Sequence, residues 1–168
     1  MFEFKTLSLD AVPAAMERAL RYRLLHMPEI AASICEDVLA IDPENQEALV
    51  MLILSMTDRF ESPRPVPVKT ARDLLPRLHG AYEREYYDGI IWEREAIAWM
   101  RSNRPLSGPA AFDCFLQAMF CFERAEALRP PANDDAILRW NSCARLIMSN
   151  RDVCRADEVD EIAANLGE

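Results

Sequence analysis

The sequence contains few of the residues from which catalytic loops and metal sites are built. Only 4 of its 168 residues are glycine and only 2 are histidine. A phosphate-binding loop and a dinucleotide fingerprint each require several closely spaced glycines, and neither motif occurs in this sequence. His26 and His79 have no second histidine or cysteine at metal-ligand spacing. We therefore expect no enzyme activity, no cofactor and no metal site.

Long apolar runs and the features of a signal peptide are also lacking. The longest apolar stretch, 48–56, is far too short to cross a membrane. A signal peptide begins with a basic segment followed by an apolar run. The first residues show no such sequence, and they include the acids Glu3 and Asp10. We therefore expect a cytoplasmic chain that does not insert into a membrane.

Positive charge is in the minority. The formal net charge is −9, and such a chain repels the phosphate backbone, so we expect no nucleic-acid binding. Neighbouring carboxylates alternate with arginines at 83–85 and 93–95, which is typical of a solvated helix face. No histidine accompanies them to form a general acid–base pair.

The cysteine content argues against a disulfide framework. The number of cysteines is odd at 5, and no CxxC spacing occurs, so we expect reduced thiols. Cys35, Cys114 and Cys121 fall at apolar positions of helical patterns, where cysteine commonly packs as a small hydrophobic residue. Cys154 lies in a polar stretch and is expected to be exposed.

Good helix formers dominate the sequence, and 51% of it is apolar, which together favour an all-α fold. Between the predicted helices, the segment Glu61–Pro67 holds three alternate prolines and is expected to be extended and exposed. Pro76 is expected to kink or shorten its helix. The apolar periodicity predicts helices over 12–26, 28–41, 47–59, 68–78, 81–102 and 110–128, one from Asp134 or Asp135, and a last one over 151–168.

Two stretches of the sequence share one spacing pattern. A small residue is followed four, seven and twelve positions later by a core residue, a second small or medium residue and a proline: Ala31, Cys35, Val38 and Pro43 in the first copy, and Ala118, Phe122, Ala125 and Pro130 in the second. This pattern resembles the second helix of a tetratricopeptide repeat and the turn that ends it. Ala19 and Tyr22 match the small and aromatic positions of the first helix of such a repeat.

The resemblance implies antiparallel helix pairs stacked as a right-handed superhelix of the tetratricopeptide type. We expect about three pairs and a C-terminal capping helix, in a single helical domain over residues 1–168. The match covers 12–57 and 110–147, and it is degenerate in between, with two insertions. Small residues at the repeat positions would let helices approach closely, and larger ones would fill the gaps.

The resemblance also implies a non-catalytic scaffold that binds a segment of another protein in its concave groove. In repeat register, the groove residues are predicted to be Met16, Leu20, Arg23, Val50, Leu54, Ile137 and Asn141. Only Arg23 and Asn141 are polar in the sense that a clamp for a C-terminal carboxylate requires. The predicted surface is therefore mostly apolar and suited to an amphipathic helix.

Two other functions remain open at this point. The chain resembles secretion-type chaperones in being short, acidic and repeat-like, so it could hold an unfolded client. Alternatively, it could be a structural homo-oligomer, such as a homodimer, that buries the apolar groove against its own copy. The groove could also be filled by the C-terminal helix.

Overall fold

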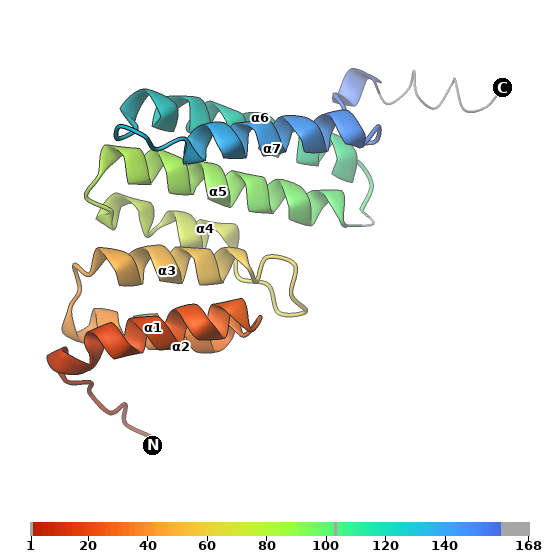
Figure 1. The fold of residues 1–168 in the computed structure, drawn as a ribbon. Helices are drawn as coiled ribbons and strands as arrows, with labels where there is room; N and C mark the ends of the chain where they lie inside the picture. The colour runs from red at the N-terminus through yellow and green to blue at the C-terminus, as the bar shows by residue number, and fades with distance from the viewer. Residues whose placement is uncertain (1, 103, 159–168) are drawn as a thin grey trace. The chain divides into compact units, whose positions relative to one another are not determined.

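The computed structural model describes residues 2–102 and 104–158. Within these residues the chain forms seven α-helices and three short 3₁₀ helices, and no strand (Figure 1). The all-α class predicted from the sequence is therefore confirmed. The chain divides into two compact units, Met1–His79 and Gly80–Glu168. The single domain expected over residues 1–168 stays a prediction.

The first unit is a set of packed helices joined by short turns. In the structure, α2 packs against both α1 and α3, and α4 packs against α3 (Figure 1). A 3₁₀ turn, Leu9–Ala11, precedes α1, and Ala11 occupies the N-cap position. The helices are α1 (Val12–Leu24), α2 (Pro28–Ile41), α3 (Gln46–Thr57) and α4 (Val68–Arg72).

Local sequence signals account for the helix boundaries on either side of the α2–α3 turn. Pro28 occupies the first turn of α2, where its missing N–H has no intrahelical partner to lose. Pro43 follows α2 in the turn. Asn45 caps α3, because its Oδ1 accepts a 2.9 Å hydrogen bond from the backbone N–H of Ala48. This cap starts α3 one residue before the predicted Glu47.

The segment after α3 behaves as its prolines predict. Glu61–Pro67 is non-helical and mostly exposed, which confirms the expected exposure and the absence of helix. The helix predicted over 68–78 is interrupted: α4 ends at Arg72, and Leu75–Arg77 forms a 3₁₀ turn instead. Pro76 explains the interruption, since proline lacks the N–H that an α-helix requires and its ring clashes with the preceding turn.

The second unit is built on α5 (Ala81–Met100), α6 (Ser107–Leu128) and α7 (Asp135–Ser149). In Figure 1, α6 lies against both α5 and α7. The start of α6 lies three residues before the predicted Ala110, because Pro109 is tolerated in the first turn of a helix. Asp134 is the N-cap residue of α7, as expected.

The chain after α7 departs from the expectation of a helix from Arg151. Residues 151–155 are not helical, and Ala156–Glu158 forms a 3₁₀ turn, while 159–168 lie outside the described residues. Cys154, expected to be exposed, is buried. The reason is a tertiary contact: the backbone at Asp152 passes so close to Gly108 at the start of α6 that no side chain would fit there.

Candidate protein-binding surface

The seven predicted groove residues are divided between the two units. Five lie on α1 and α3 in the first unit, and two lie on α7 in the second. Met16 of α1 is only 2% exposed and packs with Ala19, Cys35 and Val38. It therefore belongs to the core of the first unit and not to an accessible surface.

Arg23, another predicted groove residue on α1, already has an ion-pair partner. Its Nε donates to Oδ2 of Asp58 at 2.7 Å, and its Nη2 donates to Oδ1 at 3.3 Å. Such a two-point guanidinium–carboxylate contact holds both side chains in a defined geometry. The pair joins the last turn of α1 to the C-cap of α3. Arg23 consequently offers no unpaired charge to a carboxylate ligand.

Two predicted apolar residues are helical neighbours of this ion pair, one on each helix. Leu54 lies one turn before Asp58, and Leu20 lies nearly one turn before Arg23, so each is a helical neighbour of a paired residue. Leu20 is 45% exposed, while Val50 and Leu54 are half-buried. Four of the predicted residues are thus accessible on the first unit.

The turn between α1 and α2 exposes apolar residues that the repeat register did not single out. Leu24 is 70% exposed and follows Leu20 by one turn, so the periodicity of α1 alone indicates that the two share a face. No periodic signal identifies the residues of the turn itself, where His26 adopts a positive φ of 57°. Leu20, Leu24, Leu25, Met27 and Ile30 together are named the hairpin apolar patch.

The remaining two predicted residues form a separate set. Ile137 and Asn141 lie one turn apart on α7, and both are half-buried. Leu138 between them is 64% exposed. They belong to the second unit, so the predicted set consists of one surface on α1 and α3 and another on α7.

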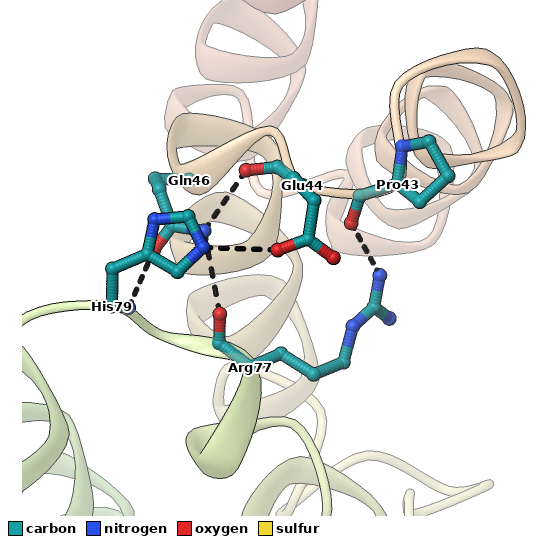
Figure 2. A network of polar contacts seen from close by, with 5 residues as sticks. All are labelled: Pro43, Glu44, Gln46, Arg77 and His79. Carbon is teal, nitrogen blue, oxygen red and sulfur yellow. Dashed lines mark hydrogen bonds and ion pairs between the residues drawn. The ribbon is translucent and has the colours of Figure 1, made fainter.

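A polar network joins the α2–α3 turn to the segment that ends the first unit. Figure 2 shows the side-chain amide of Gln46 bridging two backbone groups: its Nε2 donates to the carbonyl of Arg77 at 3.3 Å, and its Oε1 accepts from the N–H of His79 at 2.9 Å. The guanidinium of Arg77 donates to the carbonyl of Pro43 at 2.6 Å, and the His79 ring contacts Glu44 at 2.9 Å. Every contact in this network joins two segments of the first unit.

The second unit buries one carboxylate, Glu93 of α5, which is 2% exposed. The Arg139 guanidinium from α7 contacts it at 3.2 Å. Burial raises the pKa of Glu93, and the nearby charges of Arg139 and Arg94 only partly oppose this effect. A perturbed carboxyl can mark a catalytic site. Glu93 is paired with Arg139, which connects α7 to α5. The pKa of the neighbouring Cys143 thiol is raised, so this thiol is protonated at neutral pH.

The thiols are poorly suited to nucleophilic chemistry. All five cysteines are unpaired and buried. Burial raises the pKa of Cys35, Cys121 and Cys143 to about 12, with nearby carboxylates adding to the effect. The reactive thiolate is therefore scarce at neutral pH. Across residues 2–102 and 104–158, no group of three or more His, Cys, Asp or Glu side chains is placed to hold a metal ion.

Among the cavities lined by described residues, one lies in each unit. A cavity of about 280 Å³ lies between the segment Phe4–Thr6 and the outer side of α2. A cavity of about 180 Å³ lies at the start of α6, beside Asp152 and Cys154. No histidine is among the residues that line these two cavities.

In the described part of the chain, every helix is too short or too polar to cross a membrane. Among known proteins, no family model matches this chain, and no curated protein or solved structure matches it. The likeness to tetratricopeptide repeats therefore stays a prediction, and the arrangement of the first unit is the basis for inferring a function.

Proposed function

We propose that this chain is a non-catalytic, cytoplasmic protein-binding module whose partner contacts the hairpin apolar patch and the adjoining side of α3. The observation that carries the proposal is the exposure of Leu20 and Leu24 on successive turns of α1. A single exposed leucine is ordinary, whereas a cluster of exposed apolar side chains is typical of an interaction site. Val50 and Leu54 extend the apolar surface onto α3.

We further propose that the helices stack in the manner of tetratricopeptide repeats. In support, all six helical positions of the two pattern copies are fully buried, as close helix packing requires. A second support is Gly89 of α5: a Cβ added there would lie 2.5 Å from the ring of Phe122. A small residue on one helix thus receives the large residue of the next, as the repeat pattern expects.

The proposal is tested by replacing Leu20 and Leu24 together with serine. Both side chains are exposed, so the double variant is expected to keep its fold and lose its partner. A photo-crosslinking amino acid at Met27 should trap one protein in cells that make the chain, and L20S/L24S should abolish that product. Leu138→Ser, at an exposed leucine of α7, is the matched control and should leave the product unchanged.

Other results would favour the alternatives. Sedimentation that shows a stable dimer, dissociated by L20S/L24S, would favour a structural homo-oligomer. A trapped product that forms only with an unfolded client would favour a chaperone. A photo-crosslinking amino acid placed at Leu138 provides the comparison. If it trapped the same product as the one at Met27, and that product survived L20S/L24S, the surface would not be a specific binding site, and the proposed function would be wrong.

A further inference from the structure

The charge of α1 differs in sign from that of the whole chain. The helix carries Arg18, Arg21, Arg23 and one acid, Glu17, so its formal charge is 3 − 1 = +2 in a chain of −9. The Arg23 charge is neutralised by Asp58. Arg18 and Arg21 are exposed, and neither has an ion pair or side-chain hydrogen bond among the described residues. With Arg23 neutralised, two exposed cations and one exposed carboxylate, Glu17, remain on α1, so its exposed side carries a formal charge of +1 on an acidic molecule.

These arginines lie beside the exposed leucines. Arg21 lies nearly one turn before Leu24 and one turn before Leu25, and Arg18 lies nearly one turn before Arg21, so Arg18 adjoins the leucines only through Arg21. The exposed Glu17 lies one turn before Arg21 on the same side of α1. Leu24 continues the face of Leu20. The accessible part of α1 thus combines an apolar stripe with a basic edge, and both features are parts of one surface.

The combination selects the chemistry of the partner. An amphipathic helix presents apolar residues at every third or fourth position with polar residues on either side, and it can lie along such a stripe. Acidic side chains at its edge would pair with Arg18 and Arg21, and guanidinium groups suit carboxylates well. A symmetric dimer through the same surface would instead bring together two surfaces of the same net positive charge, which is less favourable.

We propose that the α1 surface formed by Leu20, Leu24 and Leu25 with Arg18 and Arg21 binds an acidic amphipathic helix of a partner protein. This inference rests on the proposed protein-binding function and adds the class of its partner. Electrostatic complementarity contributes mainly to the association rate and to the choice of partner, while the apolar contact supplies most of the affinity.

The test uses the full chain and three synthetic peptides of roughly 20 residues, long enough to form helix in water. One carries a leucine stripe with glutamates, the second has lysines in place of the glutamates, and the third scrambles the acidic peptide so that the stripe is lost. Fluorescence anisotropy should show the acidic amphipathic peptide binding about tenfold more tightly than the basic one. Raising the salt from about 0.05 M to 0.5 M should reduce this preference.

Two variants separate the apolar and electrostatic contributions. R18Q/R21Q should remove the preference for acid while leaving weak binding of both striped peptides, and L20S/L24S should abolish both. Arg145→Gln, at an exposed arginine of α7, is the matched control and should change neither.

Several results would overturn the inference. Equal or tighter binding of the basic peptide would refute the acidic partner, although loss of binding in L20S/L24S would still uphold the proposed function. Binding of the scrambled peptide as tightly as the striped one would refute the helix. If no peptide bound and the chain formed a dimer that L20S/L24S dissociates, the surface would bind a second copy. If no peptide bound a monomeric chain, the acidic helix would be excluded, and crosslinking at Met27 would still decide the proposed function.

Discussion

At the scale of single residues, close approaches between helices depend on small side chains. Ala118 of α6 is fully buried, whereas Ala127 of the same helix is exposed. Gly89 of α5 has no room for a Cβ, because the buried ring of Phe122 occupies that space. The repeat pattern identifies Ala118 as a close contact from its spacing alone, and its complete burial is consistent with that interpretation.

Replacing Ala118 with leucine is therefore expected to destabilise the chain by roughly 1–3 kcal/mol, because added methylenes overpack a site that has no free volume. Ala127→Leu makes the same chemical change on the solvent side of α6 and should alter the stability by less than about 0.5 kcal/mol. Denaturant midpoints of the two variants provide the comparison. If Ala127→Leu proved to be the damaging change, the register of the second pattern copy would be wrong.

Between elements, polar side chains connect segments that are distant in sequence. Gln46 at the start of α3 bridges the backbone at Arg77 and His79, acting as donor to one and acceptor to the other (Figure 2). Glu93 and Arg139 similarly connect α5 with α7. Each connection depends on a particular arrangement of donors, acceptors or charges, so a nearly isosteric substitution can test it.

Gln46→Glu keeps the shape of the side chain but replaces its donor with an acceptor. A carboxylate can still accept from the N–H of His79, but it opposes the carbonyl oxygen of Arg77, so we expect a loss of about 1–2 kcal/mol. Denaturant unfolding measures the loss. Gln117→Glu, on the exposed side of α6, is the control and should be nearly neutral. A Gln46→Glu chain as stable as the parent would show that the amide bridge contributes little.

The Glu93–Arg139 pair predicts a pH dependence of definite sign. Because burial raises the pKa of Glu93 above its ordinary value of 4.5, the folded chain binds this proton more tightly than the unfolded chain. Its contribution to stability is therefore fully present below pH 4.5 and is lost as the pH rises through the higher folded value. Unfolding free energies of the parent minus those of Glu93→Gln should be larger at about pH 5 than at about pH 7.

The Arg139→Met variant adds a check on this reasoning. Removing the cation should raise the pKa of Glu93 further and steepen the loss of stability toward neutral pH. It should also cost about 3 kcal/mol at neutral pH, because the carboxylate is left buried without its partner. A parent-minus-Glu93→Gln difference that grew with rising pH would mean that Arg139 outweighs burial, contrary to the prediction.

At the scale of the whole molecule, the five thiols report on the integrity of both units. Cys35 lies in the first unit, and the other four lie in the second. Since all are buried and three have a pKa of about 12, the native chain should react with a thiol reagent at pH 8 far more slowly than a free cysteine does. Rapid native modification of Cys35, Cys121 or Cys143, detected by mass spectrometry, would contradict this burial.

Local chemistry in the sequence determined the class and the boundaries of most elements. Helix-forming composition predicted an all-α chain, and prolines marked the start of α2, the segment Glu61–Pro67 and the interruption at Pro76. These signals act within a turn or two of backbone, so they can be read without the fold. The two pattern copies likewise predicted which small residues are buried, because their spacing reflects one face of a helix.

Only the tertiary structure decided which members of that face reach solvent. Met16, Leu20 and Leu24 are chemically alike and share one side of α1, yet Met16 is buried while the two leucines are exposed. The partner of Arg23, Asp58, lies 35 residues away, and the burial of Cys154 depends on backbone approaching Gly108. Helical periodicity specifies on which side of a helix a residue lies. Whether that residue is accessible depends on how far the neighbouring helices extend along that side, and long-range packing determines this.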